Sequence, residues 1–136
     1  MYSISDEHPS HGSKSIKLDL YPFNKPDYPG LAPMIKEHNW SGFNVLSFDI
    51  YSPDEQSLTI SVRIDDKKEY PEYQDRYNKR IVLDPGMNNI RVPINTLVTS
   101  GTGRALKLKE IQRLSIFVKN PDRKVVLYVD YIRLIR

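Results

Sequence analysis

Polar side chains between Tyr51 and Asn78 have the types and spacing of a ligand-binding surface. Arg63 and Asp65 are two positions apart, so on a β-strand both side chains point to the same face. Guanidinium and carboxylate groups form paired hydrogen bonds with vicinal hydroxyls, which is the chemistry that a sugar site requires. The alternative is a structural network of ion pairs that holds the loop 66–78 against the sheet.

Aromatic residues accompany these polar groups. Four of the nine tyrosines lie close together in the sequence, namely Tyr51, Tyr70, Tyr73 and Tyr77. A tyrosine combines a flat apolar ring with a hydroxyl, which suits contact with a glycan or a protein at a small cost in conformational entropy. For Tyr70 and Tyr73, packing against the sheet is an equally good interpretation.

Trp40 is the only tryptophan of the chain and stands at the start of this region. Its ring is a candidate platform for a sugar, because an aromatic face attracts polarised C–H groups. The alternative is a partly buried ring that anchors the first residues of a core strand. Of the two interpretations, the anchor is the one that we favour.

The sequence therefore predicts one contact surface for a ligand. The residues expected on it are Tyr51, Arg63, Asp65, Tyr70, Tyr73, Arg76 and Asn78, with Trp40 at its rim. The loop 66–75 is long enough to fold over this side and to contribute two of the tyrosines. The adjacent Asp75 and Arg76 also favour a structural role at the base of that loop.

Two segments must position this surface, and both alternate between large apolar and polar residues. They are 46–51 and 58–65. Alternation with a period of two predicts antiparallel strands with one buried face and one solvated face. We expect these strands to be adjacent, so that their polar residues project from one side.

The rest of the chain predicts more strands and no long helix. Further strands are expected at 15–20, 77–83, 89–94, 113–119 and 124–135, with a short edge strand near 31–35 and one helical turn within 106–112. Pro22, Pro26, Pro29 and Pro33 exclude a helix or a central strand from 21–39. About eight strands with regular turn signals predict an all-β antiparallel sandwich of the jelly-roll type, forming a single domain over 1–136.

In the predicted strands 46–51, 58–65 and 113–119, the large apolar residues stand at every second position, and these residues are expected to form the core. Its expected members are Leu46, Phe48, Ile50, Leu58, Ile60, Val62, Ile64, Leu114, Ile116 and Val118.

Composition excludes several functions. The chain has no cysteine, which excludes thiol chemistry and zinc–cysteine sites. Its 20 basic and 17 acidic residues are interspersed and give a net charge of +3, so no nucleic-acid partner is expected. No apolar run approaches the ~20 residues that span a bilayer, so no direct membrane insertion is expected.

Enzymatic motifs are also missing from the sequence. It contains no nucleophile elbow, no phosphate-binding glycine loop and no zinc-protease motif. The acidic residues Asp65, Asp66, Glu69, Glu72 and Asp75 offer candidates for a carboxylate pair. Charged loop residues are more often solvated than catalytic, so we expect the chain not to be an enzyme.

Six segments together resemble a known class of domain. They occur in the order 40–43, 46–51, 63–66, 75–78, 85–88 and 127–134, and the resemblance extends from about Ser15 to the C-terminus. The pattern resembles bacterial domains of the galactose-binding-like β-sandwich class and is similar to non-catalytic carbohydrate-binding modules. Relatives of this pattern often have histidine where Asp65 and Glu69 stand here. If those histidines contact a ligand, the resemblance implies a different ligand for this chain.

The resemblance implies a function and partners. It implies a non-catalytic module that binds carbohydrate and is appended to a larger bacterial protein, in contact with other domains of that protein. The alternative is a structural or protein-interaction module without a small-molecule ligand. We expect the chain to be excised from a parent protein of the cell envelope or the extracellular space, while the sequence itself does not determine the localisation.

The resemblance also implies a structural calcium ion between an N-terminal acidic residue and an Asp of the last strand. Asp130 matches the second position, and Asp6 or Glu7 is the nearest candidate for the first. Because the N-terminal partner belongs to a segment that we expect to be truncated, calcium binding should be weak or absent, and no other cofactor is expected. His8 and His11 have an H-x-x-H spacing without helical periodicity, so no zinc site is expected.

Overall fold

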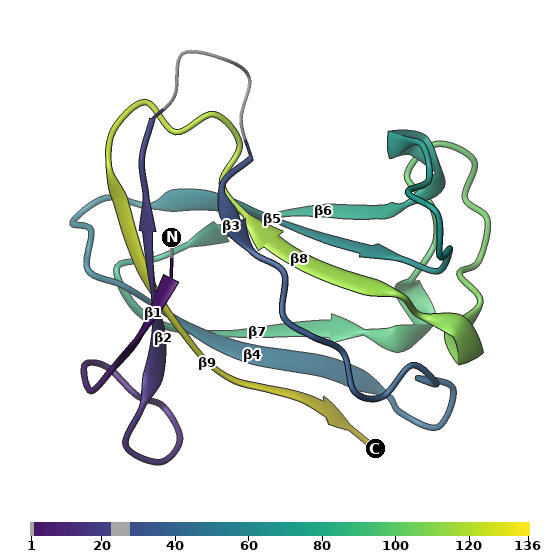
Figure 1. The fold of residues 1–136 in the computed structure, drawn as a ribbon, viewed down its shortest axis with the longest axis horizontal. Coiled ribbons are helices and arrows are strands. Elements are labelled where there is room, and N and C mark those ends of the chain that lie inside the picture. Colours follow the sequence, from purple (N-terminus) through teal and green to yellow (C-terminus); the bar gives the residue numbers. More distant parts are fainter. Residues whose placement is uncertain (1, 23–27) are drawn as a thin grey trace.

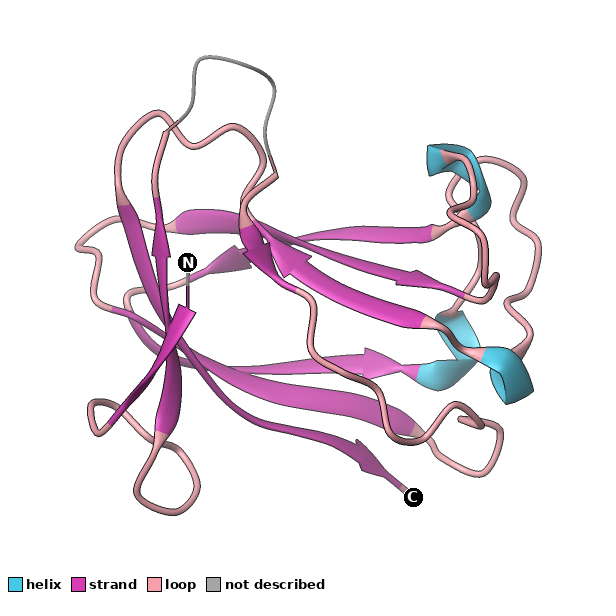
Figure 2. Ribbon diagram, in the orientation of Figure 1, coloured by secondary structure: helices cyan, strands magenta, loops and turns pink. Residues whose placement is uncertain are grey.

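The computed structural model describes residues 2–22 and 28–136, so Pro26 lies outside the described residues. The described chain forms nine strands and three short 3₁₀ turns. The strands are β1 (Tyr2–Ser5), β2 (Ser15–Leu20), β3 (Gly30–Leu31), β4 (Val45–Ser52), β5 (Leu58–Asp65), β6 (Tyr77–Leu83), β7 (Gly86–Pro93), β8 (Arg113–Phe117) and β9 (Val125–Ile135). The turns are η1 (Tyr73–Asp75), η2 (Ile94–Thr96) and η3 (Leu108–Glu110), and all three lie at the same end of the molecule (Figure 2).

The strands form two antiparallel sheets that face each other (Figure 1). The five-stranded sheet has the order β1-β2-β9-β4-β7, and the four-stranded sheet has the order β3-β8-β5-β6. The predicted all-β sandwich is confirmed. The strands at 15–20 and 77–83 have the bounds that the sequence predicted, and η3 is the helical turn expected within 106–112.

The hydrophobic core fills the space between the two sheets. Nine of the ten predicted core residues are buried, and the tenth, Leu58, is half-buried and packs against the others. The buried apolar side chains of β4 and β5 follow the predicted parity, because every second residue of a strand points to the same face. The predicted core is therefore confirmed.

The expected pairing of the strands 46–51 and 58–65 is wrong. β4 pairs with β7 and β9, whereas β5 pairs with β6 and β8, so consecutive strands lie in opposite sheets. Alternation shows only that a strand has one buried face. Two alternating strands can therefore be neighbours in one sheet or lie in opposite sheets and face each other across the core. The outer faces of β4 and β5 consequently lie on opposite sides of the molecule.

Two edge strands differ from the sequence-based expectation. β1, which pairs with β2, was not predicted, because its alternation covers only the four residues Tyr2–Ser5, which run directly into a polar segment. The edge strand expected near 31–35 is β3, which has only two residues and pairs with β8. A Cβ atom on Gly30 would lie 2.0 Å from the carbonyl oxygen of Ile116, so this close approach requires glycine.

In the described part of the chain, no helix has the length and apolar character needed to cross a membrane.

Candidate functional site

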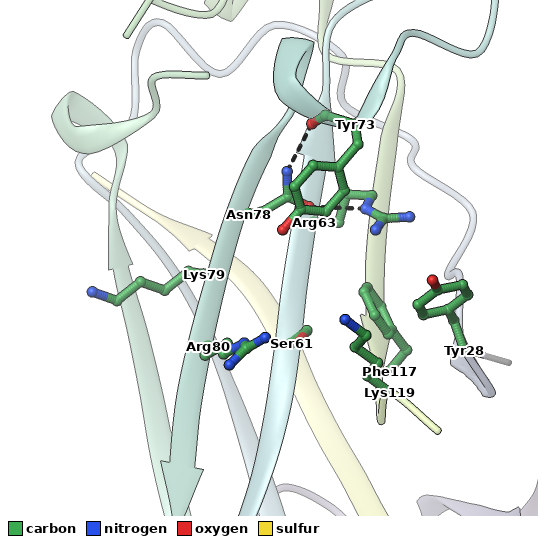
Figure 3. Close-up of a pocket in the computed structure, with 9 residues that line it drawn as sticks. All are labelled: Tyr28, Ser61, Arg63, Tyr73, Asn78, Lys79, Arg80, Phe117 and Lys119. Atoms are coloured by element: carbon green, nitrogen blue, oxygen red, sulfur yellow. Dashed lines mark hydrogen bonds between the residues drawn. The ribbon is translucent and has the colours of Figure 1, made fainter. Parts of the chain in front are cut away.

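A cavity of about 300 Å³ lies on the outer face of the four-stranded sheet (Figure 3). We call it the Arg63 cavity. Its lining consists of aromatic and basic side chains with a few neutral polar groups. The lining residues are Tyr28, Ser61, Arg63, Tyr73, Asn78, Lys79, Arg80, Phe117 and Lys119.

The register of the sheet brings most of these side chains together. Arg63 on β5 is paired with Asn78 on β6, while Ser61 is paired with Arg80 on β6 and with Phe117 on β8. Residues paired in this way point to the same face of a sheet. Every second side chain of β5 points into the core. The side chains between them, including Ser61 and Arg63, point outward and form the floor of the cavity.

Arg63 occupies the centre of this arrangement. Its Nε donates a hydrogen bond to Oδ1 of Asn78 at 2.9 Å, and its guanidinium carbon lies 4.8 Å from the centre of the Phe117 ring. Asn78 in turn donates from Nδ2 to the backbone carbonyl of Tyr73 at 3.0 Å, which joins β6 to η1. Burial, together with the nearby charge of Arg76, lowers the pKa of Arg63.

Three aromatic rings surround Arg63 in different degrees of exposure. Tyr73 is 59% exposed and Tyr28 is 49% exposed, so both offer ring surface to a ligand. Phe117 is only 7% exposed, since Arg63 and the perpendicular ring of Tyr28, 5.8 Å away, lie against it. The cavity thus combines accessible rings with hydrogen-bond donors.

Asp65 does not join Arg63 at this cavity. Its carboxylate is buried, and its Oδ1 lies 2.8 Å from Nη1 of Arg113 on β8. Burial raises the pKa of Asp65, and the ion pair with Arg113 opposes that change. Asp65 was predicted as a ligand contact, whereas the structure gives its side chain a structural partner. Arg63 and Asp65 are not paired with each other, and the cavity beside Arg63 is open.

Tyr70 and Arg76 lie beside the cavity and not in its lining. Tyr70 is 81% exposed, and the Arg113 guanidinium lies over its ring at 4.1 Å. Arg76 donates hydrogen bonds to the carbonyl oxygen of Pro71 and so stabilises the turn of the loop. Of the eight predicted contact residues, the structure therefore places only Arg63, Tyr73 and Asn78 in the cavity lining.

The base of the loop has an ion-pair network that the sequence predicts only in part. Arg104 contacts both Asp66 and Asp75, and Lys67 also pairs with Asp75. Burial alone would raise the pKa of Asp66, but hydrogen bonds from Arg104 and from the backbone N–H of Lys107 lower it. Hydrogen bonds to Asp66 and Asp75 and the attraction of both carboxylates raise the pKa of Arg104. Arg104 follows a glycine-rich loop far along the chain, so no local signal indicated its role.

Trp40 and Tyr51 lie away from this face. Trp40 is 2% exposed, and its indole N–H donates to the carbonyl oxygen of Glu37 at 2.7 Å, so its ring is an anchor in the core. Tyr51 projects from β4 in the other sheet, where its ring is stacked on His8 at 3.6 Å. The prediction that both residues border the same surface as Arg63 is wrong, because β4 and β5 belong to different sheets.

The residues near Asp130 do not fit a calcium site. Oδ2 of Asp130 accepts hydrogen bonds from the backbone N–H groups of Ser10 (2.7 Å) and His11 (2.8 Å). Oδ1 accepts another from the N–H of Tyr131 at 2.8 Å. A cation needs several oxygen ligands in place of such donors. Asp130 therefore has the surroundings of a residue that fixes the N-terminal loop.

The other candidate ligands of a metal are also engaged separately. Glu7 accepts a hydrogen bond from the hydroxyl of Tyr128 at 3.0 Å, and Asp6 pairs with Lys14. The two histidines are also apart: the imidazole of His11 is stacked on Tyr131, with ring centres 4.1 Å apart, whereas that of His8 is stacked on Tyr51. Within residues 2–22 and 28–136, no three His, Asp or Glu side chains converge on a common point.

The architecture is similar to that of solved carbohydrate-binding modules. The sequence matches no protein-family model and no curated protein. A family 11 carbohydrate-binding module from Clostridium thermocellum, solved in complex with a β-1,3-1,4-mixed-linked tetrasaccharide, aligns with 99% of this chain and 81% of its own. The identity is 19% and the TM-score is 0.76. A family 30 module of a cellulosomal cellulase from the same organism covers 98% of this chain and 80% of its own, at 12% identity and a TM-score of 0.61.

The chain has the β-sandwich fold of these carbohydrate-binding modules. The resemblance drawn from the sequence is thereby confirmed at the level of the fold.

The same fold also occurs within larger enzymes. An exo-β-agarase aligns with 98% of this chain at 19% identity and a TM-score of 0.73, but the aligned part is only 22% of the agarase. The whole of this chain thus corresponds in fold to one segment of the agarase.

Proposed function

We propose that this domain is a non-catalytic carbohydrate-binding module that holds a glycan in the Arg63 cavity. The observation that supports this most directly is an open cavity with accessible tyrosines and central hydrogen-bond donors, on a fold shared with carbohydrate-binding modules. At about 300 Å³ the cavity has room for a short stretch of a sugar chain.

The geometry provides both kinds of contact that a sugar needs. The exposed rings of Tyr28 and Tyr73 offer flat apolar surfaces for the C–H faces of pyranose rings. The Arg63 guanidinium and the Ser61 hydroxyl line the cavity floor and provide hydrogen-bonding groups for sugar hydroxyls.

Three of the five acidic residues considered for catalysis have structural partners instead. Asp65, Asp66 and Asp75 are each bound in ion pairs with arginine or lysine. Glycoside hydrolysis needs two carboxyl groups facing each other across a bond, one of them protonated. Acids that neutralise structural arginines do not fill that role.

We also propose that the module is part of a larger protein and brings its glycan to other domains of that protein. The alignment with one segment of an exo-β-agarase supports this organisation.

The test is affinity electrophoresis and titration calorimetry with a panel of soluble polysaccharides. Tyr73→Ala should weaken binding about tenfold, equivalent to ~1.4 kcal/mol, because it removes a stacking surface. Tyr2→Ala is the matched control, since Tyr2 is 64% exposed on the edge strand β1 of the other sheet. If no polysaccharide binds, the alternative of a structural or protein-interaction module is favoured.

A further inference from the structure

We propose that the Arg63 cavity binds an anionic polysaccharide, whose sugars bear carboxylate or sulfate groups. This inference rests on the proposed function and adds the charge of the ligand. Of the nine lining residues, four are cationic, namely Arg63, Lys79, Arg80 and Lys119. Within the described part of the chain, the lining includes no carboxylate.

These cations differ from the paired cations elsewhere in the molecule. The eight ion pairs between described residues use other lysines and arginines, including Lys67, Arg104 and Arg113. None of these pairs involves a residue of the cavity lining. The positive charge of the cavity is therefore not neutralised by the described carboxylates.

Arg63 is the cation for which this matters most. It is half-buried, and its hydrogen-bond partner in the described structure is the neutral amide of Asn78. Burial and the nearby positive charge of Arg76 destabilise the Arg63 cation, and the attraction of Asp65 does not offset them. The lowered pKa of Arg63 is consistent with that environment. A ligand anion would provide a directly paired opposite charge, which no described carboxylate gives to Arg63.

Arg80 and Lys119 extend the positive charge along the floor of the cavity. Figure 3 shows their side chains pointing toward Ser61 from β6 and from the segment that follows β8. Lys79 points away from Arg63 and Phe117, so it adds charge only at the outer edge. Several charges of one sign around a hollow surface attract ligands of the opposite sign.

The same lining favours a saccharide over a simple anion. Tyr28 and Tyr73 provide accessible ring faces beside the basic groups, which a free phosphate or sulfate would leave uncovered. The planar guanidinium of arginine matches the paired oxygens of a carboxylate or a sulfate ester. A neutral glucan would contact the rings and leave the positive charges uncompensated.

The test compares two double variants of the whole chain. Arg80→Gln with Lys119→Gln removes two exposed cations from the cavity. Arg91→Gln with Lys109→Gln removes the same charge from exposed positions outside the cavity lining. Binding is measured with polygalacturonate, a sulfated carrageenan, neutral mixed-linkage β-glucan and double-stranded DNA.

We expect the unmodified chain to bind polygalacturonate, carrageenan or both, and the preferred polymer identifies the acidic group. Affinity should fall about tenfold between about 50 and about 500 mM NaCl. The cavity variant should bind about tenfold more weakly or worse, while the control variant should stay within about twofold of the unmodified chain.

Other outcomes overturn the inference in distinguishable ways. Binding of the neutral β-glucan alone keeps the proposed function and refutes the anionic ligand. Binding of none of the polysaccharides refutes both. Equal binding of DNA, weakened equally in the two double variants, shows a general attraction to polyanions and refutes a specific site.

Discussion

Arg104 donates two parallel hydrogen bonds to the carboxylate of Asp66. Its Nη1 lies 2.8 Å from Oδ2 and its Nη2 lies 3.0 Å from Oδ1. The side chain of Asp66 is completely buried, and the backbone N–H of Lys107 donates to it as well, at 2.7 Å. This pair joins the loop after β5 to the segment before η3, so it stabilises the end of the four-stranded sheet.

Replacing Arg104 should therefore destabilise the domain. Arg104→Ala leaves the buried carboxylate of Asp66 without its cation, which we expect to lower the free energy of unfolding by about 3 kcal/mol. Urea denaturation monitored by fluorescence measures the change. Lys14→Ala is the control, because Lys14 and Asp6 form an exposed pair with side-chain exposures of 61% and 77%. Its effect should stay below about 0.5 kcal/mol, and equal effects of the two variants would contradict the prediction.

The stability of the domain should fall in acid, and Asp66 should contribute to that fall. The pKa of Asp66 is lowered from its ordinary value of 3.8, so the unfolded state binds more protons as the pH drops. Its stabilising contribution is present above this value and is lost as the pH falls through the lower folded pKa. Asp66→Asn should flatten the dependence of the unfolding free energy on pH between about pH 5 and about pH 2.

Asp65 should have the opposite effect over the neighbouring pH range. Burial raises its pKa above 3.8, so the folded state takes up the proton first and acidification favours folding. Asp65→Asn should thus steepen the loss of stability in acid. Chemical denaturation at several pH values compares the two variants, and a change of slope in the same direction for both would refute the assignment.

The register of β5 can be tested at Ile60, which is 1% exposed in the core. Ile60→Ala should cost about 2–5 kcal/mol of unfolding free energy through lost burial and the cavity that remains. Val82→Ala on the neighbouring β6 is the control, since Val82 is 63% exposed. An unchanged urea midpoint for Ile60→Ala would refute the register.

Calcium should not stabilise this chain. Both carboxylate oxygens of Asp130 accept hydrogen bonds from backbone N–H groups, and a bound cation would have to displace those donors. We expect the melting temperature to be the same in calcium and in chelator. A rise on adding calcium that chelator reverses would overturn this expectation and assign the ion to Asp130 with Asp6 or Glu7.

The sequence by itself determined the local structure of this protein. The sequence predicted the strands Ser15–Leu20 and Tyr77–Leu83 with their correct bounds, and parity predicted which apolar side chains of β4 and β5 are buried. It also predicted that Arg63 and Asn78 would face away from the core, as they do. These features depend on the period of a strand and on burial of one face, which neighbouring residues in the chain encode.

Only the tertiary structure decided which side chains meet. It separated Tyr51 from Arg63 by placing β4 and β5 in different sheets, and it covered Asp65 with Arg113. It also brought Tyr28 and Lys119 to the cavity from segments far from β5 in the sequence. The outward position of Phe117 was implied by the parity of Leu114 and Ile116, but its place beside Arg63 depended on the pairing of β8 with β5. Strand partners are set by long-range packing of the two sheets, and alternation within a strand holds no information about which partner it will have.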